Sequence, residues 1–111
     1  MDADQGNLFA GVPVGAADEV FTALLERRGL KIERIVSNGQ ASPPGFWYDS
    51  QQEEWVLLLE GSAAVQIEGE AAPRLLQPGT WLRLPAHCRH RVAWTEAGRP
   101  TVWLAVHYDG C

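Results

Sequence analysis

From Leu30 onward the chain consists of short runs that are apolar or alternate between apolar and polar residues. Residues typical of turns lie between these runs, about every eight to twelve positions. This pattern is typical of an all-β protein, because the side chains of a half-buried strand alternate between a dry face and a wet face. About eight strands are predicted, over residues 30–36, 46–49, 54–60, 63–68, 72–76, 80–84, 89–95 and 101–108. Short antiparallel strands in so small a domain bury their faces as a sandwich or a barrel, and we predict a jelly-roll barrel.

The segment before Gly29 has a helical spacing instead, which predicts one short N-terminal α-helix over residues 16–28. Its apolar positions, three and four residues apart, are Ala17, Val20, Phe21, Leu24 and Leu25. Acidic residues lie in the first turn and arginines in the last, and Gly29 is a typical C-terminal stop. We therefore expect one domain over residues 1–111, with an N-terminal arm and helix at 1–29 and the β-barrel at 30–108.

A length of 111 residues is typical of a single domain, and an apolar content of 46% supports a core without disulfides. The longest apolar run, residues 55–59, is far shorter than the roughly 20 residues of a membrane-spanning helix. The acidic N-terminus is unlike a secretory signal, so we expect a cytoplasmic protein in which Cys88 and Cys111 are reduced.

The charge of the chain argues against nucleic acid as a partner. Fourteen acidic residues against nine basic residues give a net charge of −5, which is the wrong sign for a phosphate-binding surface. The basic residues are scattered along the chain, so no basic patch is expected. We therefore expect neither nucleic acid nor a membrane as a partner.

Two stretches carry glycine, proline, glutamate and histidine at spacings that resemble a known pair of motifs. They are Glu54-Trp-Val-Leu-Leu-Leu-Glu-Gly61 and Gly79-Thr-Trp-Leu-Arg-Leu-Pro85-Ala-His87-Cys-Arg-His90. The cupin superfamily of small jelly-roll barrels, also called double-stranded β-helices, has the motifs G(X)5HXH(X)3,4E(X)6G and G(X)5PXG(X)2H(X)3N. The first stretch is similar to the end of the first motif, and the second stretch to most of the second. The chain thus resembles a small single-domain cupin over roughly residues 45–94.

The departures from these motifs concern the two histidines of the first motif. Their positions hold Tyr48 and Ser50 under one allowed spacing, or Trp47 and Asp49 under the other. In the second motif His87 stands where a glycine is usual, and Trp94 stands where an asparagine is usual. The first motif is therefore incomplete as a metal-binding motif.

In metal-binding cupins, the histidines and glutamate of the first motif and the histidine of the second hold a divalent ion inside the barrel. By this resemblance Glu54 and His90 are candidate ligands of zinc, iron, nickel or manganese, and His87 or Asp49 is a candidate to complete the ligand set. Each residue also has an ordinary explanation, as a surface carboxylate, a turn aspartate, a solvent-facing histidine or an interior histidine. The first functional hypothesis is therefore a metal and a small molecule bound inside the barrel.

The second hypothesis is a metal-free binding or sensor-like cupin. The resemblance places Trp47, Tyr48 and Trp94 at or near the positions that face the family's cavity, where large aromatic side chains favour an apolar or ring-shaped ligand. Their alternative role is to fill the barrel core. For His107 a structural role is favoured, and Cys88 is not favoured as a nucleophile.

Cupins include enzymes, storage proteins and sensor domains, so the resemblance leaves open whether this chain is an enzyme. The reaction, if there is one, and the small-molecule ligand also stay open. A homodimer is expected, because such barrels often pair through an exposed edge strand.

Overall fold

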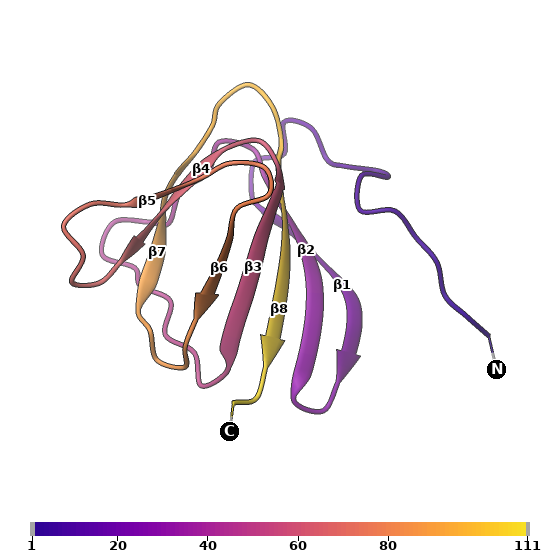
Figure 1. The fold of residues 1–111 in the computed structure, drawn as a ribbon. Coiled ribbons are helices and arrows are strands. Elements are labelled where there is room, and N and C mark those ends of the chain that lie inside the picture. The colour runs from indigo at the N-terminus through magenta and orange to yellow at the C-terminus, as the bar shows by residue number, and fades with distance from the viewer. Residues whose placement is uncertain (1, 111) are drawn as a thin grey trace.

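The computed structural model of this protein describes residues 2–110, and this part of the chain contains eight β-strands and no helix (Figure 1). The strands are β1 (Val20–Arg27), β2 (Leu30–Ser37), β3 (Glu53–Glu60), β4 (Ala63–Ile67), β5 (Arg74–Leu76), β6 (Trp81–Leu84), β7 (His90–Thr95) and β8 (Thr101–Tyr108). Cys88 carries a free thiol, and Cys111 lies outside the described residues.

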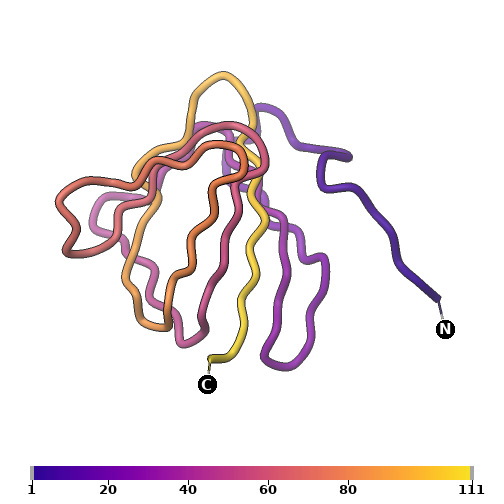
Figure 2. The backbone as a smooth tube through the Cα atoms, viewed as in Figure 1, coloured from indigo at the N-terminus to yellow at the C-terminus, as the bar shows by residue number. Residues whose placement is uncertain are grey.

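The strands form two antiparallel sheets that make the two walls of a jelly roll. One sheet has five strands in the order β1-β2-β8-β3-β6, and the other has three strands in the order β5-β4-β7. Figure 2 shows the backbone crossing between the sheets at both ends, while the N-terminal segment runs away from the barrel beside β1. The predicted all-β jelly roll is therefore confirmed.

The predicted N-terminal helix is wrong, because residues 20–27 form strand β1. Strands β1 and β2 are the two arms of a hairpin whose connection is Arg28-Gly29, and Gly29 has a φ of 73°. The register of this hairpin shifts between Ala23 and Leu25, so a β-bulge turns the later side chains to the other face. An interrupted alternation of this kind imitates helical spacing, and the turn glycine imitates a helix C-terminal stop.

None of residues 2–110 belongs to a helix that is long and apolar enough to cross a membrane.

The predicted strand at residues 46–49 is reduced to a single β-bridge between Tyr48 and His90. Pro43, Pro44 and Gly45 precede this segment, and they limit its pairing because proline has no amide proton to donate. Two backbone hydrogen bonds join the bridged residues, at 2.7 Å and 3.2 Å. This bridge fixes the segment across the start of β7.

The apolar core fills one end of the space between the sheets. Its buried members are Val56, Leu58, Ala63, Val65, Leu76, Leu82, Trp103 and Ala105. The short turn Gly61-Ser62 between β3 and β4, which the sequence predicts, lies at this closed end. Polar inward-facing residues occupy the opposite end, where β3 begins and β8 ends.

Candidate functional site

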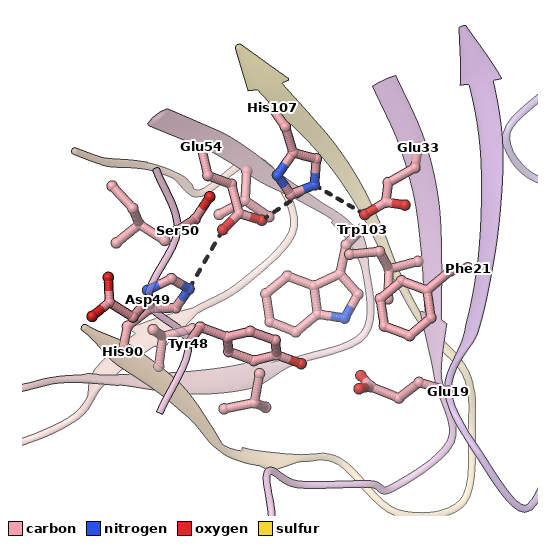
Figure 3. A pocket seen from close by; sticks show the side chains of 15 residues that line it. Glu19, Phe21, Glu33, Tyr48, Asp49, Ser50, Glu54, His90, Trp103 and His107 are labelled. Carbon is pink, nitrogen blue, oxygen red and sulfur yellow. Dashed lines mark hydrogen bonds and ion pairs between the residues drawn. The ribbon is translucent and has the colours of Figure 1, made fainter. Parts of the chain in front are cut away.

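A cavity of about 200 Å³ opens at the polar end of the barrel, between the two sheets (Figure 3). Its apolar wall consists of Ile35, Val56, Val65, Leu84 and Val92, and its aromatic wall of Phe21, Tyr48 and Trp103. Its polar lining consists of Glu19, Glu33, Asp49, Ser50, Glu54, His90 and His107. Four carboxyl groups and two imidazoles therefore line one small space.

The sheet register explains why residues far apart in sequence meet here. Glu54 of β3 lies opposite His107 of β8 on one side and opposite Leu84 of β6 on the other. Directly paired residues of antiparallel strands share a face, so these three side chains all face the cavity. His90 is the first residue of β7 and approaches from the other sheet.

The carboxylates and imidazoles alternate in a chain that links both sheets (Figure 3). Glu54 Oε1 lies 3.4 Å from His90 Nε2, and Glu54 Oε2 lies 3.9 Å from His107 Nε2. His107 Nε2 donates a hydrogen bond of 2.9 Å to Glu33 Oε1. Glu33 is 5% exposed, and its other oxygen lies 3.4 Å from Lys31 Nζ. This arrangement can hold a proton on an imidazole or pass it between neighbours.

The orientation of the His90 ring is set by the backbone. Its Nδ1 lies 2.8 Å from the carbonyl oxygen of Cys88 and donates to it, so Nε2 faces Glu54. Burial by itself disfavours the charged imidazole, but the hydrogen bond to Glu54, the Cys88 carbonyl and the charge of Glu54 together raise the pKa of His90 above its ordinary value. His90 is therefore suited to carry a proton beside a carboxylate.

Tyr48 covers one side of this chain. Its ring stacks on that of His90, with the centroids 5.3 Å apart and the planes at 24°. Burial raises the pKa of the Tyr48 hydroxyl, and the negative charges of Glu19, Glu54 and Glu33 raise it further. The phenol therefore stays protonated and is available as a hydrogen-bond donor in the cavity.

The residues predicted from the motifs fall into two groups. Glu54, His90 and Tyr48 lie together in the cavity, and Asp49 lies at its edge. His87, in the left-handed conformation at a φ of 61°, pairs with Asp49 instead, at 2.8 Å between Nδ1 and Oδ1. The side chain of His87 is 66% exposed and does not line the cavity.

The two predicted tryptophans do not line the cavity either. Trp94 is 42% exposed. The Trp47 ring faces the Arg89 guanidinium, whose carbon lies 5.7 Å from the ring centroid. Of the three aromatic residues predicted at the pocket, Tyr48 alone lines it.

Several cavity residues were not expected from the motifs, namely Glu19, Phe21, Glu33, Trp103 and His107. The helix predicted over residues 16–28 concealed Glu19 and Phe21. The only signal for Glu33 is its position two residues before Ile35 in the strand Leu30–Ser37, which places both side chains on the same face. His107, for which the sequence favours a structural role, lies between the buried Glu33 and the half-buried Glu54.

The donor set does not fit a preformed metal centre. Two donors that each lie about 2.1 Å from one ion are about 3.0 to 3.4 Å apart. The Glu54–His90 pair meets this condition at 3.4 Å, but His107 Nε2 lies 3.9 Å from Glu54 and is bonded to Glu33. Among residues 2–110, no three side chains of His, Cys, Asp or Glu are grouped so that they could hold an ion.

Comparison with solved structures finds the same fold in other proteins. A protein from Ralstonia eutropha JMP134, named a "putative mannose-6-phosphate isomerase", is 69% identical, with a TM-score of 0.96, and the match covers 97% of this chain and 100% of that one. A cupin superfamily protein from Desulfitobacterium hafniense DCB-2 is 15% identical with a TM-score of 0.77, over 99% of this chain and 95% of that one. A search of curated proteins gave no match.

The sequence also matches a family model directly. The model describes the Cupin domain, and it matches residues 34–107. This range contains both stretches that resemble the cupin motifs and all the strands from β3 to β7. The chain therefore belongs to the cupin family.

Proposed function

We propose that this protein binds a small molecule in the barrel cavity and holds its polar group against the Glu54–His90 pair. The observation that carries this proposal is the series of contacts Glu33–His107–Glu54–His90, because it places the buried Glu33, the half-buried Glu54 and two imidazoles inside an open cavity. Buried charges cost stability unless they are paired, and a cluster at the mouth of a cavity is where binding or catalysis uses them. The proposal corresponds to the metal-free hypothesis, except that Phe21 and Trp103 line the cavity in place of Trp47 and Trp94.

The apolar and aromatic wall supports the same proposal. Tyr48, Phe21 and Trp103 offer ring faces, while the chain of carboxylates and imidazoles offers hydrogen-bond partners. Known ligand sites combine these features, since apolar contacts supply binding energy and a few polar groups fix orientation. His90, with its raised pKa, would donate a proton to a ligand oxygen, and Glu54 would accept one.

The test is a thermal-shift and NMR screen of small polar metabolites, including mannose 6-phosphate, which the name of the Ralstonia relative suggests. A compound that stabilises the parent is expected to lose its effect in His90→Ala and Glu54→Ala but to keep it in His87→Ala, a histidine outside the cavity. Unchanged binding in His90→Ala and Glu54→Ala would contradict the proposal, as would a screen in which no compound binds.

A divalent metal in the cavity is the second candidate, because Glu54 Oε1 and His90 Nε2 already stand at the separation of two metal ligands. The experiment is elemental analysis of untagged protein purified without chelator, beside His90→Ala and Glu54→Ala. Near-stoichiometric metal that both substitutions remove would favour this candidate. Absence of metal, with no thermal stabilisation on adding zinc, iron, nickel or manganese, would discard it.

A further inference from the structure

We propose that the ligand of this cavity is a small organic cation, such as an amine or a quaternary ammonium compound, whose positive group lies against Glu19. This inference rests on the small-molecule-binding function proposed above and names its substrate class. It is carried by the charge of the lining residues and by the aromatic rings beside Glu19.

The charge of the lining is one-sided. Four lining residues carry a carboxyl group, two carry an imidazole, and none is lysine or arginine. Glu33 and Glu54 are partly balanced by the histidines and by Lys31, and Asp49 pairs with His87. Glu19 is different, because no basic side chain of residues 2–110 lies within ion-pair distance of it.

Glu19 is nevertheless held in place. Its Oε2 accepts a hydrogen bond from the Ser37 hydroxyl, and Ser37 Oγ accepts one of 3.1 Å from Trp103 Nε1. Ser37 is fully buried, so its hydroxyl holds the Glu19 carboxylate in a fixed position. The charge of that carboxylate stays unbalanced. A fixed and uncompensated carboxylate at a cavity wall is complementary to a positive ligand group.

The aromatic rings around Glu19 favour an organic ammonium group as the ligand. Figure 3 shows Phe21 beside Glu19, with the rings of Trp103 and Tyr48 around the same space. Aromatic faces attract cations, most strongly where water is excluded, and of these three rings Trp103 is buried whereas Phe21 is 53% exposed. Burial is the main cause of the raised pKa of Tyr48, and the carboxylates of Glu19, Glu54 and Glu33 raise it further. The field of these carboxylates attracts positive charge and repels anions.

A phosphorylated sugar does not match this cavity. A phosphate monoester carries a charge of about −1.5 to −2 at pH 7 and is normally bound by arginine, lysine or a helix N-terminus. None of these lines the cavity, and residues 2–110 contain no helix. The cavity volume of about 200 Å³ lies below the roughly 300–1,000 Å³ of sites for drug-sized ligands. A cavity of this size suits a compact amine.

The experiment compares cations with neutral compounds of the same shape by isothermal titration calorimetry, at low salt and with chelator present. The pairs are choline with 3,3-dimethylbutan-1-ol and benzylamine with benzyl alcohol, and mannose 6-phosphate is the anionic probe. At least one cation is expected to bind the parent about tenfold more tightly than its neutral partner. Glu19→Gln, which keeps an oxygen for Ser37, is expected to remove most of that preference, whereas Glu60→Gln, outside the cavity, leaves it unchanged.

The inference is overturned if the neutral compounds bind as tightly as the cations, if neither cation binds, or if mannose 6-phosphate binds most tightly. Cation binding that is unchanged in Glu19→Gln overturns it as well. If Glu19→Gln does not fold, the comparison within each pair still decides the matter on the parent. A neutral or anionic compound whose binding His90→Ala abolishes would overturn this inference and leave the proposed function standing.

Discussion

Glu54 lies at the centre of the polar lining, since its two oxygens face histidines on opposite sheets. Its position in the sequence follows from the spacing to Gly61 in the first cupin motif, and that of His90 from the spacing to Gly79 and Pro85. Their contact is therefore the part of the site that sequence reasoning reached. What the contact does to each residue depends on burial and on neighbours that no spacing encodes.

The pKa of His90 is a direct measure of this contact. Burial lowers it, and Glu54 with the Cys88 carbonyl more than offsets that effect, so an NMR titration of the parent should give a pKa above the ordinary value. In Glu54→Gln the pKa of His90 should fall, because the charge is lost while the burial remains. Glu60→Gln, which changes a glutamate outside the cavity, should leave it unchanged.

The same shift predicts how stability depends on pH. A histidine whose pKa is higher when folded stabilises the protein fully below its unfolded pKa, about 6.5, and this contribution is lost as pH rises through the folded pKa. Urea unfolding should therefore show that the free energy of unfolding falls more from pH 6 to pH 8 in the parent than in Glu54→Gln. A parent His90 pKa at or below the ordinary value would contradict both expectations.

Glu33 and His107 show why the rest of the site was not predictable. They are 74 positions apart in sequence, and their hydrogen bond exists because β2 and β8 pair in one particular register. Shifting β2 by one residue against β8 would turn Glu33 to the outer face of the sheet and break its contact with His107. A single sequence does not specify such a register between distant strands, so their meeting was invisible.

At the scale of the element, β1 is the instructive failure. Phe21 and Leu25 have helical spacing, yet they belong to a strand whose bulge changes the face of its side chains. Pairing with β2 decides the conformation, because tertiary contacts outweigh the weak intrinsic preference for a helix. The strands from β3 to β8 were predicted to within a few residues, since their alternation is regular and turn residues bound them.

The hairpin between β3 and β4 provides a test at this scale. Gly61 has a φ of 89°, and a Cβ there would lie 2.4 Å from Thr101 Oγ1 and 2.7 Å from Thr101 Cα. Gly79 has a similar φ of 94°, but a Cβ there would meet nothing within 4 Å. Gly79→Ala should therefore cost only the left-handed strain, about 1–2 kcal/mol. Gly61→Ala should cost clearly more, about 3 kcal/mol or above, because backbone must also move.

Urea unfolding of the two variants under the same conditions measures this difference. Equal losses for Gly61→Ala and Gly79→Ala would mean that the approach of Thr101 to the turn contributes nothing. The comparison isolates packing from conformational strain, because both glycines occupy the same region of backbone space.

For the whole molecule, the sheet edges bear on assembly, and the expected homodimer stays a prediction. β1 forms one edge of the five-stranded sheet (Figure 1). Every residue of β1 after Val20 is exposed. Phe21 and Leu24 are 53% and 49% exposed on this strand. An exposed edge with apolar side chains is a template for pairing with a second copy about a two-fold axis.

Sedimentation velocity measures this assembly. The parent is expected to sediment as a dimer of the 12.2 kDa chain, and Leu24→Lys on β1 is expected to sediment as a monomer. Leu75→Lys, an equally simple change of a 69% exposed leucine on β5, should stay dimeric. A monomeric parent, or a Leu24→Lys dimer, would contradict pairing through β1.

The division of the barrel into an apolar closed end and an open polar end also has a consequence for its motions. Strand β3 runs through both ends of the barrel. At the apolar end Leu58 is fully buried and its amide donates a hydrogen bond to the Thr80 carbonyl oxygen, and at the polar end Glu54 lies beside the cavity. Amide protons around Leu58 should exchange with solvent only through global unfolding, while those near Glu54 exchange through smaller local openings. A ligand in the cavity should therefore slow hydrogen exchange at one end of this strand far more than at the other.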